Sequence, residues 1–251
     1  MYYSHELGKE CSLLKEIRIE QGTTADYRAL AEFHYRSHRV GAVRRIFRAM
    51  RGEEIFGVIV YVYSPICQLG RKQVFPKVPI QEMNQKLSSI QRVVVHPKYR
   101  TIGLGQRLVR ETLALVSTPF VETIAVMAKY NPFFEKAGMR RVWDVQAPEA
   151  ALKIRDVLIQ LGFDVTFLGS PRYVYTKLQG LNAADLQSVR EVFQKNIIPR
   201  FIKEFFYHLP YGKHDLYRQE LKTAPLEKLT RLVNITALLL QSKVYLFWEA
   251  A

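Results

Sequence analysis

The feature that most constrains this chain is a strand, a glycine-containing loop and a helix that follow one another directly. Residues 89–95 end in three valines, which favour a buried strand, and Pro97 stops it. Gly103 and Gly105 then begin a segment, 105–116, whose apolar residues recur at helical spacing. Glycines let a ligand approach the backbone, and the unpaired amides at a helix start bind anions. The segment therefore predicts a pyrophosphate site within an α/β fold.

Two familiar phosphate loops do not fit this segment. A Walker loop needs Gly, four residues and then Gly-Lys-Ser/Thr, which is absent from the chain. The dinucleotide fingerprint needs a third glycine where this chain has Leu108. The pattern present is Arg-x-x-Gly-x-Gly, from Arg100 to Gly105.

A second motif follows in residues 125–139, AVMAKYNPFFEKAGM, which combine a strand, Asn131, a short helix and aromatic-Glu-Lys-x-Gly. Together and in this order, the two motifs resemble those of the Gcn5-related N-acetyltransferases, over residues 17–145. The resemblance implies an α/β fold with a mixed, mostly antiparallel sheet. Its two central parallel strands, here 89–95 and 121–128, would splay apart and hold acetyl-CoA in the cleft between them.

The resemblance also implies which residues would contact acetyl-CoA. The end of the first splayed strand would hydrogen-bond the pantetheine arm like an added strand. The glycine loop and the first helical turn would hold the pyrophosphate, and the second motif would pack near the thioester. The implied cofactor-binding residues are Val93, Val94, Val95, Arg100, Thr101, Ile102, Gly103, Leu104, Gly105, Gln106, Asn131 and Phe134.

The implied reaction is direct attack of an amine on the thioester, which needs a base for the amine and an acid for the thiolate. Phe134 stands where many members place a tyrosine, so Tyr130 is the candidate acid, with a packing or stacking role as its alternative. Ser89 stands where some members place a glutamate, so Glu122 is the candidate base, with Glu82 or a water chain as alternatives. These departures leave open a non-catalytic module that binds CoA or nucleic acid.

The segment after the first expected helix, FHYRSHR from residue 33, alternates aromatic and basic side chains. In the family this region borders the acceptor, so we expect acceptor contacts from His34, Tyr35, Arg36, His38 and Arg39. Such a segment suits an anionic acceptor such as RNA or tRNA, through charge and stacking. A protein or small-molecule amine, and a merely solvated basic face, are the alternatives. The histidine pair lacks a third ligand, so no metal site is expected.

Composition agrees with an anionic ligand, because 37 Lys and Arg against 23 Asp and Glu give a net charge of +14. Part of that charge lies in an arginine-rich stretch without acids, residues 36–51. Two cysteines are too few for a disulfide framework, which predicts a cytoplasmic protein. No apolar run approaches the roughly 20 residues of a membrane helix, so no membrane association is expected.

Two domains are expected. Residues 1–145 form the acetyltransferase-like domain, and residues 146–251 form a mainly helical C-terminal extension for acceptor binding or homodimerisation, with a strand at 164–168. The chain also resembles the acetyltransferase-like part of a prokaryotic family in which this domain is fused to an ABC-type ATPase. No ATPase motif is present, so the chain would be the acetyltransferase part alone or a stand-alone relative, with an ABC-type ATPase as a candidate partner.

Overall fold

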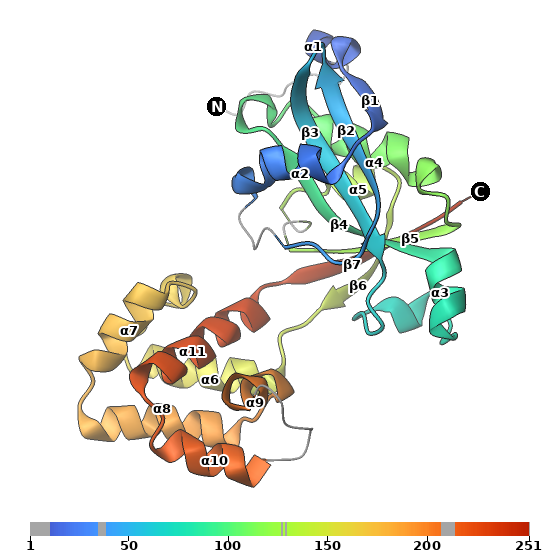
Figure 1. The fold of residues 1–251 in the computed structure, drawn as a ribbon. Helices are drawn as coiled ribbons and strands as arrows, with labels where there is room; N and C mark the ends of the chain where they lie inside the picture. The colour runs from blue at the N-terminus through green and yellow to red at the C-terminus, as the bar shows by residue number, and fades with distance from the viewer. Residues whose placement is uncertain (1–10, 35–38, 127, 129, 207–213, 251) are drawn as a thin grey trace, which may run out of the picture. The chain divides into compact units, whose positions relative to one another are not determined.

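The computed structural model describes residues 11–34, 39–126, 128, 130–206 and 214–250. The chain divides into two compact units (Figure 1). The first comprises residues 1–145 together with 243–251, and the second comprises residues 146–242. Each unit has a hydrophobic core of its own.

The first unit is built on a seven-stranded sheet in the order β1-β2-β3-β4-β5-β7-β6. All neighbouring strands are antiparallel except β4 and β5, which are parallel. The predicted mixed, mostly antiparallel sheet is therefore confirmed. The strands are β1 (Arg18–Gln21), β2 (Val43–Arg51), β3 (Glu54–Tyr63), β4 (Leu87–Val95), β5 (Phe120–Ala125), β6 (Arg140–Val145) and β7 (Lys243–Glu249).

Helices cover both faces of this sheet (Figure 1). Leu108 and Val109 of α4 lie in one core cluster with Ile59 on one face, whereas Tyr27 of α2 lies in another with Val58 on the other face. This division follows from β3, whose apolar residues alternate between the two faces. The helices of this unit are α1 (Ser12–Glu16), α2 (Thr24–Leu30), α3 (Ile80–Lys86), α4 (Leu104–Thr112) and α5 (Phe133–Lys136), with short 3-10 turns η1 (Ala31–Phe33), η2 (Arg71–Gln73), η3 (Pro97–Tyr99) and η4 (Leu113–Val116).

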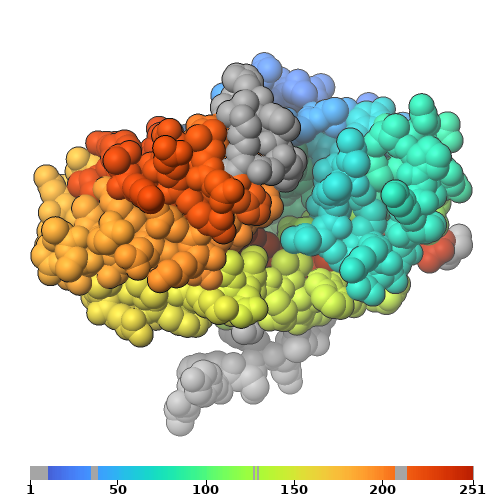
Figure 2. All heavy atoms as spheres, turned by 90° about the horizontal axis from the view of Figure 1, so that it is seen from below, coloured from blue at the N-terminus to red at the C-terminus, as the bar shows by residue number. Residues whose placement is uncertain are grey.

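A long connection, residues 64–86, joins β3 to β4 and contains η2 and α3. Its residues, turquoise in Figure 2, form a continuous part of the surface of the first unit. Phe75 and Met83 anchor the connection because they pack with Leu87, Tyr245 and Phe247 of the sheet.

The last strand corrects the predicted domain boundary. Residues 243–249 do not belong to a helical extension, because β7 lies in the sheet between β5 and β6. Its run from Val244 to Phe247 is buried, as expected of a strand with neighbours on both sides. The helical region is therefore an insertion between β6 and β7. Its two ends meet at the paired residues Val145 and Lys243.

The second unit is helical in its described part. The predicted strand at 164–168 is wrong, because Val165–Phe167 forms a 3-10 turn whose N-terminal Asp164 accepts a hydrogen bond from the Thr166 amide at 2.8 Å. Among the described residues, no helix has the length and apolarity needed to span a bilayer. The helices are α6 (Glu149–Gln160), α7 (Pro171–Gln179), α8 (Ala183–Lys195), α9 (Pro199–Phe205), α10 (His214–Lys222) and α11 (Leu226–Leu240).

Excision of the insertion is expected to leave a folded first unit. Because Val145 and Lys243 are cross-strand partners, a two-residue Asn-Gly turn can join them as a β-hairpin. We expect the shortened chain to unfold in one cooperative urea transition, and residues 146–242 alone to give a helical circular dichroism spectrum with its own transition. Aggregation of the shortened chain, or an unfolded helical fragment, would show that the two units depend on each other to fold.

Candidate functional site

The two parallel strands separate soon after they begin. β4 and β5 pair only from Leu87 with Phe120 to Ser89 with Glu122. One further link follows, in which the Thr123 hydroxyl donates to the Ile90 carbonyl at 2.9 Å. A cleft of about 150 Å³ opens beyond this point. The described residues that line it are His34, Ile90, Gln91, Arg92, Val93, Thr123, Ile124, Ala125, Val126, Ala128, Phe133 and Phe134.

The separation leaves one edge of β4 available to a ligand. On its other side β4 is paired with β3 as far as Val95, opposite Gly57. On the cleft side, its register with β5 ends at Ser89. Backbone N–H and C=O groups at such an edge need partners, and an extended ligand with amide groups supplies them.

The glycine loop begins at the end of β4. Gly103 is the N-terminal cap of α4 and has a φ of 92°, a conformation that strains any residue with a Cβ. Gly105 lies in the first helical turn, where an added Cβ would sit 3.8 Å from Val95 Cγ2 and 3.9 Å from the Phe133 ring. The first intrahelical amide of α4 is that of Arg107, which donates to Gly103. The amides before it have no partner within the helix, and amides at such a position can bind an anion.

A sheet opened between two parallel strands, with an anion-binding helix start beside the opening, is the arrangement that the two motifs predicted. The first unit has the fold of the Gcn5-related N-acetyltransferases.

Comparison with solved structures finds acetyltransferases. The IAA acetyltransferase of Bacillus cereus is 16% identical, and the match covers 52% of this chain and 81% of that protein, with a TM-score of 0.38. A GNAT family acetyltransferase of Elizabethkingia anophelis with acetyl-CoA bound is 14% identical, and the match covers 53% of this chain and 81% of that protein, with a TM-score of 0.37. The ribosomal-protein-S18-alanine N-acetyltransferase of Escherichia coli is 11% identical, and the match covers 52% of this chain and 82% of that protein, with a TM-score of 0.37. No protein-family model and no curated protein sequence matches the chain.

The residues predicted to contact the cofactor lie in different surroundings. Val93 and Phe134 line the cleft. Val94 is buried under α2, and Leu104 is buried in the core, so only their backbone groups are available. Asn131 is exposed and is not among the residues that line the cleft.

The rest of the glycine loop is held by its own side chains. Arg100 donates to the Val95 carbonyl at 3.2 Å and to the Phe33 carbonyl at 2.9 Å, so it fixes the loop against β4 and η1. Ile102 packs partly against the core, and Thr101 has a positive φ of 71°. Gln106 donates to the Lys136 carbonyl at 3.1 Å, which ties α4 to α5.

Glu122 does not have the surroundings of a catalytic base. It is fully buried, and Arg71 donates to both of its oxygens, at 2.6 and 3.0 Å. The Tyr245 hydroxyl donates to it at 2.9 Å. Burial and then this neighbouring carboxylate raise the pKa of Tyr245, which keeps the hydroxyl protonated as a donor. Glu122 is absent from the cleft lining, so its observed role is structural and corrects the predicted one.

The other predicted acid–base residues also lie apart from the cleft lining. Tyr130 is 72% exposed and does not line the cleft. Glu82 forms an ion pair with Lys86 at 2.8 Å on α3. The polar residues that sequence reasoning missed are Gln91, Arg92 and Thr123. They follow the point at which β4 and β5 separate, and no local sequence pattern marks that point.

Of the residues predicted to bind the acceptor, His34 lines the cleft. The Arg39 carbonyl accepts from the Arg92 guanidinium, which also lines it, at 3.0 Å. Tyr35, Arg36 and His38 lie outside the described residues. No group of three potential metal ligands occurs in the part of the chain that the structure describes.

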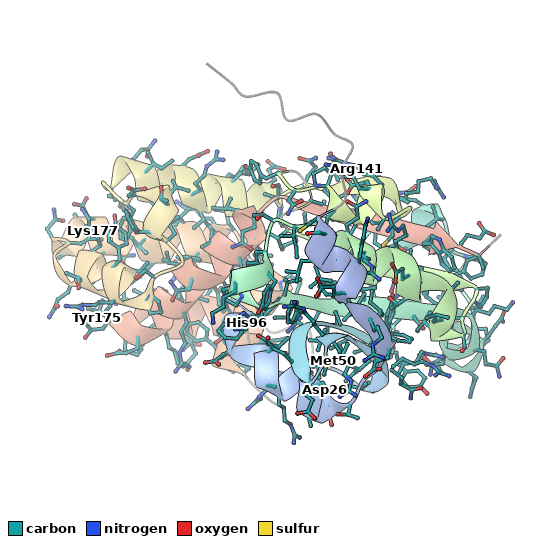
Figure 3. All side chains as sticks on the ribbon, turned by 90° about the horizontal axis from the view of Figure 1, so that it is seen from above. Asp26, Met50, His96, Arg141, Tyr175 and Lys177 are labelled. Carbon is teal, nitrogen blue, oxygen red and sulfur yellow. The ribbon has the colours of Figure 1, made fainter. Side chains whose placement is uncertain are left out.

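The arginine-rich stretch 36–51 is largely engaged within the protein. Asp26 on α2 (Figure 3) completes a capping box with Thr23 and also pairs with Arg48. Burial acts to raise the pKa of Asp26, but hydrogen bonds from Thr23 and Arg48 outweigh it and lower that pKa. These arginines therefore tie β2 to its neighbours. The contacts are Arg44 with the Asn84 carbonyl and the Tyr63 ring, Arg48 with Glu20 and Asp26, and Arg51 with Glu16.

Proposed function

We propose that the protein is an acetyl-CoA-dependent N-acetyltransferase that transfers an acetyl group to an amine. The observation that carries this proposal is the contiguity of two binding features. The free edge of β4 ends at Val95, and Val95 lies beside Gly105 in the first turn of α4. An extended chain of amides that ends in a pyrophosphate fits both features at once. Coenzyme A is a cofactor of that shape.

The reaction is a direct transfer. The amine nitrogen attacks the thioester carbonyl, the carbon–sulfur bond breaks, the amine loses a proton and the thiolate gains one. Among the described lining residues, His34 is the side chain of the type that exchanges protons near neutral pH. Arg92 lines the same cleft with a permanent charge. We therefore assign the proton transfer from the amine to His34.

For the acceptor we favour an amine on a protein or a small molecule. The RNA or tRNA acceptor was predicted from the net charge, part of which lies in residues 36–51, and from the alternating aromatic and basic side chains that begin at residue 33. Arg44, Arg48 and Arg51 have intramolecular partners, which weakens the part of that support that came from the charge of residues 36–51. Incubation with labelled acetyl-CoA and separate pools of RNA, protein and polyamine would decide, because label in RNA alone would contradict our preference. A homodimer and an ABC-type ATPase partner stay predictions.

The test of the proposed function has two measurements. Calorimetry with acetyl-CoA should show saturable binding, and desulfo-CoA should bind comparably because it retains the pantetheine arm and the pyrophosphate. Release of free CoA thiol should then depend on an added amine. If acetyl-CoA does not bind, the proposal fails. Binding without thiol release over a broad panel of amines would instead establish a non-catalytic CoA-binding module.

Replacement of His34 by glutamine should lower kcat about 100-fold, because general acid–base catalysis contributes roughly 10²–10⁴-fold. The KM for acetyl-CoA should change little, and the loss should be rescued in part by raising the pH, which deprotonates the amine without a base. Steady-state kinetics across pH measure both effects. The exposed His214→Gln in α10 is the matched control. Equal activity of the two variants would contradict the assignment.

A further inference from the structure

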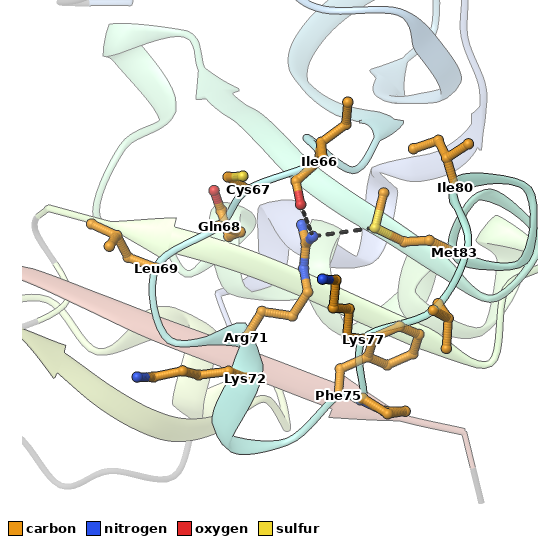
Figure 4. A pocket seen from close by; sticks show the side chains of 12 residues that line it. Ile66, Cys67, Gln68, Leu69, Arg71, Lys72, Phe75, Lys77, Ile80 and Met83 are labelled. Atoms are coloured by element: carbon orange, nitrogen blue, oxygen red, sulfur yellow. Dashed lines mark hydrogen bonds between the residues drawn. The ribbon is translucent and has the colours of Figure 1, made fainter. Parts of the chain in front are cut away.

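The first unit holds a second pocket, distinct from the cleft. It has a volume of about 500 Å³ and lies in the β3–β4 connection, around η2 and α3 (Figure 4). None of its lining residues lines the cleft. Most of them are apolar, and two that lie on its border, Ile66 and Leu69, are 77% and 61% exposed. The lining residues are Ile66, Cys67, Gln68, Leu69, Arg71, Lys72, Phe75, Pro76, Lys77, Val78, Ile80 and Met83.

One wall of the pocket is held in place by Arg71. Its guanidinium donates to the Ile66 carbonyl at 3.0 Å and to the Met83 sulfur at 3.2 Å (Figure 4). It also donates to the Pro65 carbonyl at 2.6 Å. Its remaining donors bind Glu122, which compensates its charge. The backbone of the connection is thereby fixed around a buried side chain, so the pocket is formed before any ligand arrives.

The pocket carries positive charge that its own walls do not compensate. Lys72 and Lys77 are exposed lining residues, and no described acidic residue lies within ion-pair distance of either. The lining itself contains no Asp or Glu. In Figure 4 the Lys77 side chain extends toward the middle of the ring of side chains, beside Arg71, whereas Lys72 points outward. An apolar hollow with lysines at its mouth complements an apolar ligand that ends in one negative charge.

We propose that this pocket binds a small amphipathic carboxylate of the medium-chain fatty acid type. The alkyl chain lies against Phe75, Ile80 and Met83, the carboxylate pairs with Lys77, and Lys72 adds positive charge at the border of the pocket. The volume falls within the roughly 300–1,000 Å³ of small-molecule sites. Binding would also cover Ile66 and Leu69, which are otherwise exposed to water.

Methyl NMR on the full chain tests this proposal with decanoate as the probe. In protein labelled at the methionine methyl groups, Met83→Leu assigns the resonance of Met83, which lies in the pocket wall. Decanoate, kept below its micelle concentration, should shift that resonance saturably. Met50 and Met139, which lie elsewhere in the unit, should not move. Decylammonium, with the same chain and the opposite charge, should bind at least about 10-fold more weakly.

The lysines give the matched variants. Lys72→Glu with Lys77→Glu should weaken decanoate binding at least about 10-fold, whereas Lys177→Glu on α7 of the second unit (Figure 3) should not. Unchanged Met50 and Met139 resonances show that the variants are folded. The proposal would be overturned if decylammonium bound as tightly as decanoate, or if acetyl-CoA displaced decanoate. It would also be overturned if the double lysine variant weakened decanoate binding no more than Lys177→Glu does. Calorimetry with acetyl-CoA is a separate readout, so the proposed function can stand or fall independently.

Discussion

Replacement of Arg71 by methionine is expected to lower the free energy of unfolding by about 3–5 kcal/mol, because it leaves a buried charge without a partner. Glu122 is fully buried, and Arg71 is the cation that pairs with it, at 2.6 Å. The Tyr245 hydroxyl would remain, but one neutral donor does not replace a bidentate guanidinium. The same substitution removes the hydrogen bonds to the Pro65 and Ile66 carbonyls that fold the β3–β4 connection. Urea denaturation measures the loss.

A double variant separates the lost pair from the stranded charge. Arg71→Met with Glu122→Leu removes both charges, so it should be more stable than Arg71→Met alone. Arg141→Met is the surface control, because Arg141 pairs with Asp144 at half-exposed positions and such pairs contribute about 0–1 kcal/mol. If Arg71→Met lowers the free energy of unfolding no more than Arg141→Met does, Arg71 is not needed to compensate the buried charge of Glu122.

The pair also explains why the sequence misled us about Glu122. An acidic residue inside an apolar strand indicates either chemistry or a buried partner. The partner lies 51 positions away in a proline-containing connection that has no periodic pattern. Local spacing carries no information on such a pairing, whereas it does determine a helix cap or a strand. The same holds for Arg44, Arg48 and Arg51, whose partners lie on other elements.

Features that depend on neighbouring residues were predictable. The strand, glycine loop and helix from β4 to α4 occur as expected, because valines, a proline and two glycines fix them locally. The place of β7 in the sheet was not predictable, since its apolar run fits a docking tail as well as a strand. Only the order of strands, with β7 between β5 and β6, decides between the two. That order is set by packing between residues that an insertion of about a hundred residues separates.

The cleft contains residues that local sequence motifs predict and residues whose position depends on the pairing of distant segments. Val93 and Phe134 could be predicted, because they lie within motifs. Gln91, Arg92 and Thr123 could not, because their position depends on where the β4–β5 pairing stops. The sequence motifs identify residues at the ends of the proposed cofactor site, whereas the register of β4 and β5 determines which polar groups line the cleft between them.

Replacement of Gly105 by glutamate should reduce acetyl-CoA affinity by roughly 100-fold or more, equivalent to ~2.8 kcal/mol. The added side chain would occupy the space in which the pyrophosphate approaches the first amides of α4, and its charge would repel the phosphates. The fold should tolerate it. A Cβ at Gly105 meets its neighbours at 3.8 Å or more, and an acidic side chain in a first helical turn is favourable. Calorimetry should therefore show weaker acetyl-CoA binding, whereas urea denaturation should show an unchanged free energy of unfolding.

Two further variants show whether the loss comes from the site. Gly105→Ala should keep or slightly raise stability, by about 0.4–1 kcal/mol, because alanine restricts the unfolded chain and suits a helix. It should weaken acetyl-CoA binding less than Gly105→Glu does, since it adds one methyl group and no charge. Gly169→Glu adds the same charge in the second unit, at a position with open space, and should leave binding unchanged. Acetyl-CoA affinity that survives Gly105→Glu would place the pyrophosphate somewhere other than the start of α4, and the proposed cofactor site would then be wrong.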